Sequence, residues 1–162
     1  MSNLRVSNLI ENLQSLMGGV WRKMPSRVRG WAIGLTNPRF MVSVGAVITD
    51  ESGRVLLFKH VFRTGNGWGI PGGFIKRGEN PEDALRRELC EEARLELVEI
   101  KFARARTFRR PQQLELIYRA RAVGTPNTEN FEIASFAWRT REELSEHLSA
   151  AQRRLIESVL DI

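Results

Sequence analysis

Three glutamates lie close together in one short charged segment of the chain, at positions 88, 91 and 92. On a helix, residues three and four apart share a face, so Glu88, Glu91 and Glu92 would meet there. Like charges at these spacings repel one another, and partial burial weakens their solvation further. A divalent cation relieves such repulsion, and Mg²⁺ or Mn²⁺ favours oxygen ligands of this kind.

The surrounding residues predict a helix that begins after a loop. Asn80 suits the N-cap, Pro81 suits the first helical position, and the two acids that follow face the positive end of the helix dipole. The helix is expected to run from about Pro81 to about Arg94, with an apolar stripe formed by Leu85, Leu89 and Ala93. The glutamates would then lie at the edge of the core. The alternative is a solvated acidic face balanced by arginines.

The loop and helix together resemble the Nudix box, G-x5-E-x7-R-E-U-x-E-E-x-G-U, in which U is an aliphatic residue. The positions in register are Gly73, Glu79, Arg87, Glu88, Leu89, Glu91, Glu92 and Leu95. Arg94 stands where the family has a glycine near the helix C-terminus, a place where left-handed backbone is common. We expect either a conformational cost of about 1 kcal/mol at Arg94 or a helix that continues past it.

The resemblance implies an α/β fold, a Nudix-type α/β/α sandwich with a mixed β-sheet over residues 40–162, preceded by an N-terminal helical arm over residues 1–39. It also implies an Mg²⁺-dependent pyrophosphohydrolase, with Mn²⁺ as a possible substitute. Such an enzyme cleaves a nucleoside diphosphate linked to another moiety X, in a nucleotide sugar, an ADP-ribose-like compound or a nucleoside triphosphate. The alternative is a catalytically weak Nudix-fold module that binds nucleotide or RNA. The complete set of box acids favours the enzyme.

By the same resemblance, the metal ligands would be Gly73 through its carbonyl, Glu88, Glu91 and Glu92. The resemblance leaves Glu88 either as a ligand or as the group that positions or deprotonates water. Glu79 would pair with Arg87 and brace the loop against the helix. Glu132, six residues before Trp138, matches the place of a further catalytic glutamate, with Glu129 as the competing choice. A surface-loop acid without a role is the alternative for both.

Strands are predicted on both sides of the box. The expected elements are strands over 40–49, 54–62, 96–108, 113–122 and 131–139, a turn over 50–53, and helices near 141–148 and 150–160. The glycine-rich segment 68–73 is expected to be a turn that lets the backbone approach a ligand closely. Thr140 and Glu143 have the spacing of a capping box.

Arginines recur on the strands that follow the box. Alternation in the strand 96–108 would put Phe102, Arg104 and Arg106 on one face. Arg109 follows in a turn, and the returning strand carries Arg119 and Arg121 on one face. Because arginine binds phosphate in a bidentate manner, Arg104, Arg106 and Arg109 are candidate substrate-binding residues. A solvated sheet face is the alternative.

The totals set broad limits on partners and location. A net charge of +6 suits polyanionic partners such as nucleotides. The single cysteine, Cys90, rules out an internal disulfide, and no run suits a bilayer span or a secretory signal, so a cytoplasmic location is expected.

Residues 1–39 predict an amphipathic basic helix, broken or ended by Gly18-Gly19 and Pro25. This arm would pack on its own domain or on a partner subunit, so a homodimer is possible. No stable nucleic-acid or membrane partner is expected.

Overall fold

The computed structural model describes residues 2–63, 65–127 and 131–162. They fall into two compact units, Met1–Arg39 and Phe40–Ile162. The first unit contains α1 (Ser2–Lys23) and α2 (Ser26–Thr36). The second contains one mixed sheet and the remaining helices.

Seven strands form this sheet. They are β1 (Met41–Thr49), β2 (Val55–His60), β3 (Trp68–Gly69), β4 (Gly72–Phe74), β5 (Glu96–Phe108), β6 (Gln113–Val123) and β7 (Ile133–Arg139). The main path runs β3-β2-β1-β6-β5, with β4 paired to β1 and β7 paired to β2. β1 and β6 are parallel, whereas the other pairs are antiparallel.

β1 changes its antiparallel partner along its length. Its end pairs with β2 at Thr49 and Val55, whereas its first half pairs with β4 over Ser43–Gly45 and Gly72–Phe74. The chain between β3 and β4 therefore crosses the sheet at the middle of β1. This crossing places the glycine-rich segment beside the helix that carries the glutamates.

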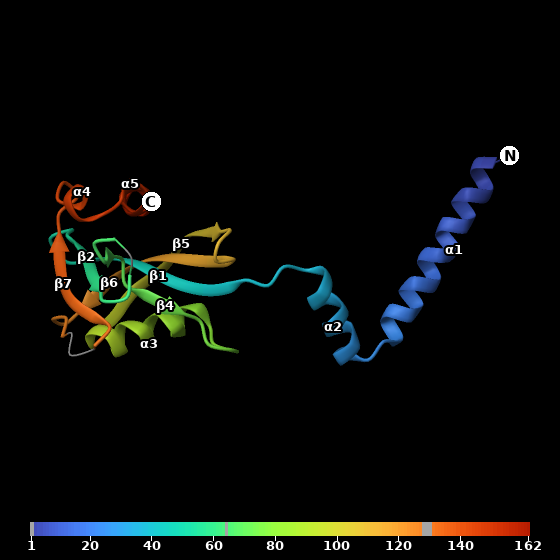
Figure 1. The fold of residues 1–162 in the computed structure, drawn as a ribbon, viewed down its shortest axis with the longest axis horizontal. Coiled ribbons are helices and arrows are strands. Elements are labelled where there is room, and N and C mark those ends of the chain that lie inside the picture. The colour runs from blue at the N-terminus through green and yellow to red at the C-terminus, as the bar shows by residue number, and fades with distance from the viewer. Residues whose placement is uncertain (1, 64, 128–130) are drawn as a thin grey trace. The chain divides into compact units, whose positions relative to one another are not determined.

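Helices cover both faces of the sheet, as Figure 1 shows. α3 (Pro81–Ala93) packs on one face through Leu85 and Leu89, which are fully buried with residues of β1 and β2. α5 (Ala150–Leu160) covers the other face through Leu155 and Ile156, and the short α4 (Leu144–His147) precedes it. Burial of these apolar side chains holds the layers together. The predicted α/β/α sandwich with a mixed sheet is confirmed.

The box helix ends one residue earlier than the sequence pattern predicts. It stops at Ala93, and Arg94 adopts left-handed backbone with φ 52° and ψ 31°. The helix therefore does not continue past Arg94, and the conformational cost expected there stays a prediction. Asn80 is the N-cap residue, but its side chain makes no capping bond and instead donates to Asp83 Oδ2 at 3.1 Å.

Strand β5 departs from simple alternation. Its register against β6 shifts between Val98 and Lys101 and again between Phe102 and Arg104. Phe102 packs edge-on against Tyr118 of the α3-side core, whereas Arg104 reaches Ser158 of α5. The prediction that Phe102 and Arg104 share a face is wrong, because each bulge inserts an extra residue and changes the alternation.

Three other local predictions differ from the structure. The segment 68–73, predicted as a turn, contributes β3 and part of β4. α4 spans four residues of the longer helix expected near 141–148, although Glu143 accepts the Thr140 N–H at 2.9 Å as one half of a capping box. In the arm, α1 continues through Gly18-Gly19, and the break comes at Pro25.

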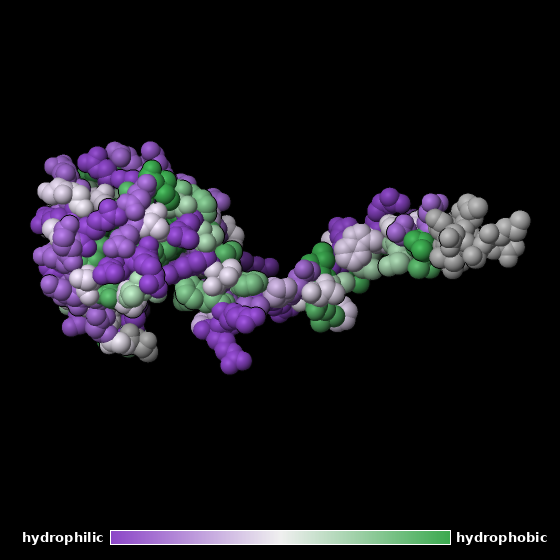
Figure 2. All heavy atoms as spheres, turned by 90° about the horizontal axis from the view of Figure 1, so that it is seen from above, coloured by the Kyte–Doolittle hydropathy of each residue, from purple (hydrophilic) through white to green (hydrophobic). Residues whose placement is uncertain are grey.

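The arm combines exposed apolar side chains with positive charge. Leu16 is 67% exposed and Trp31 is 67% exposed, and Figure 2 shows hydrophobic and hydrophilic side chains interleaved along this segment. Residues 1–39 contain six basic residues and one acidic residue, a charge of +5, which leaves +1 for residues 40–162. No helix among the described residues is long and apolar enough to cross a membrane.

Candidate active site

Glycines allow the main chain of β4 to lie directly against the box helix. A Cβ at Gly73 would lie 2.2 Å from Cδ of Glu88, so only glycine leaves room for that carboxylate. Gly72 has φ +150°, and a Cβ there would lie 2.1 Å from the carbonyl oxygen of Val44. The glycine-rich segment therefore brings Gly73 beside Glu88, and its close approach to a ligand stays a prediction.

Arg87 connects this strand and the following loop to the helix. Its Nε donates to Glu79 Oε1 at 2.7 Å and its Nη2 donates to Glu79 Oε2 at 3.0 Å. Nη2 also donates to the carbonyl of Phe74 at 3.1 Å, and Nη1 donates to Glu88 Oε1 at 2.8 Å. The hydrogen bonds from Arg87 lower the pKa of Glu79 to about 2. A bidentate ion pair of this kind fixes the loop geometry.

Glu92 is the buried member of the glutamate set, with 6% of its surface exposed. Its Oε2 has no hydrogen-bond partner among the described residues. Burial raises the pKa of Glu92 to about 8, and the nearby charges of Glu88 and Glu132 act in the same direction. Arg63 and a main-chain hydrogen bond from Gly72 offset this only in part. The negative charge of Glu92 thus lacks full compensation within the protein.

Glu91 lies at the margin of the site. Its side chain is 54% exposed and faces Arg87 Nη1 at 3.4 Å and Lys76 Nζ at 3.9 Å. The part of the chain that the structure describes has no three acidic, histidine or cysteine side chains already arranged to hold a metal ion. One reason is that the Glu88 carboxylate is engaged with Arg87.

The two candidates for a further glutamate have different outcomes. Glu132 lies near enough to Glu92 for its charge to raise the pKa of Glu92, so the structure brings it to the edge of the cluster. Its carbonyl accepts the N–H of Val61 at 2.9 Å, which ties it to the loop after β2. Glu129 lies outside the described residues.

The three candidate substrate-binding arginines do not form one group. Arg106 pairs with Glu115 across β5 and β6, and its guanidinium lies 4.8 Å from the centre of the Phe108 ring. Arg104 donates to Ser158 Oγ of α5 at 2.7 Å. Arg109 is exposed in the turn between the strands. The charge of Arg106 acts to lower the pKa of Arg63, which lies near the glutamates.

Sequence reasoning missed Arg63, which lies in the loop between β2 and β3. A Cβ added to Gly69 would collide with its guanidinium, and its charge acts on both Glu92 and Glu115. Arg63 also borders an open pocket of about 570 Å³ together with Trp68 and Gln152. An arginine beside buried carboxylates and an aromatic ring is a combination suited to a phosphorylated, aromatic ligand. No periodic pattern marks a loop residue of this kind.

Comparison with known proteins agrees with this arrangement. The family model of the NUDIX domain matches residues 39–159. A MutT-like protein of Streptomyces ambofaciens is 32% identical over 115 residues, which cover 69% of this chain and 71% of that protein. The chain belongs to the Nudix family, and it is a Nudix hydrolase acting on diphosphate bonds. Members of this family typically depend on divalent cations.

Other relatives resemble this chain over a shorter segment or in their fold. An RNA pyrophosphohydrolase of Saccharophagus degradans is 45% identical over 56 residues, which cover 35% of this chain and 32% of that protein. A MutT NUDIX hydrolase from Burkholderia pseudomallei superposes with a TM-score of 0.66 at 26% identity, covering 75% of this chain and 99% of its own. The NUDIX domain of Shewanella oneidensis NrtR, solved with ADP ribose, has a TM-score of 0.66 at 18% identity, covering 89% and 96%, and shows the fold alone.

Proposed function

We propose that this protein is an Mg²⁺-dependent hydrolase of a nucleoside diphosphate linked to a second moiety, with its catalytic centre at Glu88, Glu91, Glu92 and Glu132. The observation that carries the proposal is the buried and uncompensated carboxylate of Glu92 beside the Gly72-Gly73 strand. A buried charge of this kind is costly unless a cation or a proton neutralises it. A divalent cation is therefore the natural complement of the cluster.

The residues present fit such a cation. Carboxylate and carbonyl oxygens are the ligands that Mg²⁺ and Mn²⁺ prefer, and the set comprises the Gly73 carbonyl with Glu88, Glu91 and Glu92. When bound, the cation supplies neutralisation of the diphosphate and makes a water easier to deprotonate. For the cation to bind, the Glu88 carboxylate must release Arg87 and turn toward the cation.

The rest of the work falls to this chain's own side chains. Glu79 and Arg87 hold the loop in place and leave the glutamates in register with the strand. Arg63 and Arg106 bind phosphate oxygens of the substrate through their guanidinium groups. Trp68 offers a ring for the base in the pocket that Arg63 borders. Glu88 or Glu132 positions the attacking water, and catalysis rests on orientation and charge.

The test is product release from a panel of candidate substrates with Mg²⁺ or Mn²⁺. The panel contains ADP-ribose, a nucleotide sugar, a nucleoside triphosphate and an RNA with a 5′-terminal triphosphate. Glu92→Gln is expected to lose at least roughly 100-fold in kcat/KM, because it removes a charge at the cation. Glu96→Gln, an exposed acid beyond the helix, is the matched control and should retain activity.

Two outcomes oppose the proposal. Full turnover in Glu92→Gln would remove the glutamate cluster from the mechanism. Absence of turnover on every panel member, with nucleotide or RNA still bound, would favour the alternative of a catalytically weak binding module.

A further inference from the structure

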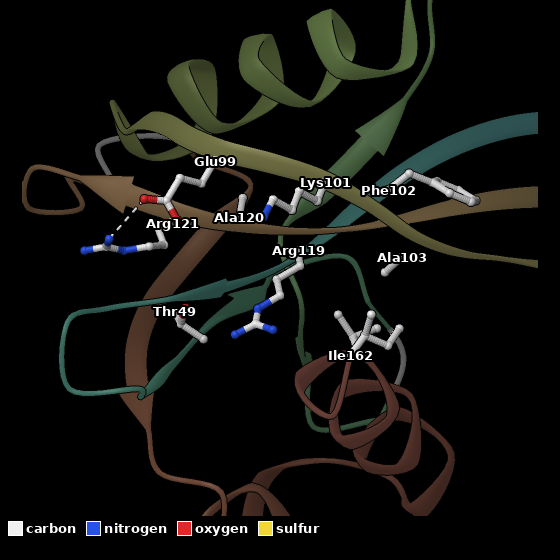
Figure 3. A pocket seen from close by; sticks show the side chains of 10 residues that line it. Thr49, Glu99, Lys101, Phe102, Ala103, Arg119, Ala120, Arg121 and Ile162 are labelled. Carbon is white, nitrogen blue, oxygen red and sulfur yellow. Dashed lines mark hydrogen bonds and ion pairs between the residues drawn. The ribbon is translucent and has the colours of Figure 1, made fainter.

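A second pocket lies on the face of the sheet that α5 covers, as Figure 3 shows. Its volume is about 270 Å³. The walls come from β1, β6 and β5, with Ile162 on the side of α5 in Figure 3. Val159 of α5 also borders the pocket. The charged side chains that border it are Glu99, Lys101, Arg119 and Arg121.

This pocket is separate from the catalytic centre. Gly73 pairs with Val44 in the first half of β1, whereas Thr49 in the pocket wall ends that strand. The five residue steps along the extended strand from Val44 to Thr49 correspond to about 16 Å. The glutamate cluster lies on the face of the sheet that α3 covers, whereas this pocket lies on the face that α5 covers.

The charges around the pocket do not balance. Glu99 accepts from Arg121 Nη1 at 3.2 Å, so this acid and this base compensate each other. The side chains of Lys101 and Arg119, both exposed to solvent, have no hydrogen-bond or ion-pair partner among the described residues. Figure 3 shows both side chains at the pocket, Lys101 from β5 and Arg119 from β6. Two cations that share a pocket attract an anion that can face both.

The backbone of the wall is irregular in the same place. Glu99 has a positive φ of 53°, and the register of β5 against β6 shifts on both sides of Lys101. Bulges of this type redirect side chains and recur beside binding sites. The Glu99 side chain pairs with Arg121 at the same place, and both side chains are largely exposed. The bulges therefore help to set the positions of the cations around the pocket.

The pocket has a polar part and an apolar part. Lys101, Arg119 and the hydroxyl-bearing Thr49 supply the polar lining, and Val159 and Ile162 supply apolar lining from the C-terminal side of the chain. A volume of about 270 Å³ corresponds to roughly nine water molecules in the liquid, more than a single phosphate group occupies. An occupant that satisfies both parts carries an anionic head and a compact apolar body.

We propose that this pocket binds a phosphate monoester with an apolar organic group, as a second ligand site distinct from the site of diphosphate hydrolysis. The phosphate faces Lys101 and Arg119, which can donate charge-assisted hydrogen bonds to its oxygens. The organic group lies against Val159 and Ile162. The ligand has no diphosphate bond, so the enzyme does not consume it.

Isothermal titration calorimetry on the full chain, without divalent cations, tests this site. The probes are phenyl phosphate, inorganic phosphate and phenol. Phenyl phosphate should bind more tightly than inorganic phosphate, and phenol should bind much more weakly than either. Lys101→Gln and Arg119→Gln should each weaken phenyl phosphate by roughly 10-fold or more. Arg119→Lys keeps the charge and should recover part of the affinity, and thermal melts of all variants verify folding.

Two control variants make the result decisive. Arg154→Gln removes an exposed arginine of α5 that does not border the pocket, and it should leave the affinity unchanged. Arg63→Gln removes the phosphate-binding arginine of the catalytic side, so the phenyl phosphate affinity that depends on Lys101 and Arg119 should remain in that variant. The proposal is overturned by an absence of phenyl phosphate binding, by equal affinity in Arg119→Gln and wild type, or by a loss in Arg63→Gln in place of Arg119→Gln.

Discussion

Arg87 Nε and Glu79 Oε1 lie 2.7 Å apart and join the helix of the Nudix box to the loop that precedes it. A second bond between the same side chains makes the pair bidentate, and the same guanidinium also contacts Glu88 and the main chain of Phe74. The pair therefore sets where the loop lies relative to the glutamates. Its role in this geometry is structural.

Replacement of Glu79 by Gln should change how stability depends on pH. The folded pKa of Glu79 is about 2, below its ordinary value of 4.5, so its contribution to stability is complete above pH 4.5 and is lost as the pH falls toward 2. Glu79→Gln should therefore be less stable than wild type at pH 7, with the difference shrinking between pH 4.5 and 2. Urea unfolding at several pH values measures it. Glu96→Gln is the control, and a constant difference down to pH 2 would contradict the role of the pair.

Replacement of Gly73 by Ala should lower activity without unfolding the protein. The added Cβ would lie 2.2 Å from Cδ of Glu88, so that carboxylate must move. We expect a loss of roughly 10- to 100-fold in kcat, as for other displaced catalytic groups. Gly19→Ala, where nothing lies within 4 Å, is the matched control. A wild-type kcat in Gly73→Ala would show that the position of Glu88 is not limiting.

The metal-free protein should become less stable as the pH rises. In the native state Glu92 keeps its proton up to a pKa of about 8, whereas in the unfolded chain it loses the proton near its ordinary pKa of 4.5, so stability falls between pH 4.5 and 8. Glu92→Gln lacks this loss and should melt higher than metal-free wild type at pH 8, by roughly 5 °C. Added Mg²⁺ should stabilise wild type and leave Glu92→Gln unchanged. Identical pH profiles for the two proteins would argue against the burial of this charge.

Arg94 permits a direct test of backbone strain. It has left-handed backbone with φ 52°, a conformation that costs an ordinary residue about 1 kcal/mol. Arg94→Gly should be more stable than Arg94→Ala by about this amount, because both variants lose the arginine side chain and differ only in the Cβ. Chemical denaturation measures the difference, and activity should be equal in the two variants. Greater stability of the alanine variant would exclude strain at this position.

The arm should mediate self-association. Leu16 and Val20 are 67% and 56% exposed and lie near one another on α1, and apolar stripes of this kind favour a partner. We expect a dimer in light scattering, reduced to a monomer by Leu16→Gln combined with Val20→Gln. Ser15→Gln, which changes a side chain about 100° around the helix from Leu16, should have no effect. A monomeric wild-type protein would leave these side chains to another partner.

The sequence predicted the parts of the site that depend on local order. The spacing of the glutamates, the bounds of α3 and the left-handed option at Arg94 follow from helix periodicity and end geometry, which a single segment contains. The long strands followed from alternation. The short strands β3 and β4 were not predicted, because glycine and proline are depleted in strands. In the structure, pairing with β1 and β2 overrides that preference.

Features that depend on distant contacts could not be read in this way. Arg63 reaches Glu92 only because the loop after β2 folds over Gly69. The second bulge of β5 puts Phe102 on the α3 side of the sheet, whereas Arg104 and Arg106 keep the predicted alternation with no register shift between them. The environment of Glu92 likewise depends on acids from two segments, and a linear pattern does not contain their distance.

The uneven division of charge has a practical consequence for handling the protein. The pI of about 10.4 belongs to the whole chain, but residues 1–39 carry +5 of its +6 charge. Proteolysis near Arg39 would therefore turn a strongly basic protein into a nearly neutral fragment of residues 40–162. On a cation-exchange column the intact chain should be retained at neutral pH while this fragment elutes early. Elution position thus reports directly whether a preparation still contains its first 39 residues.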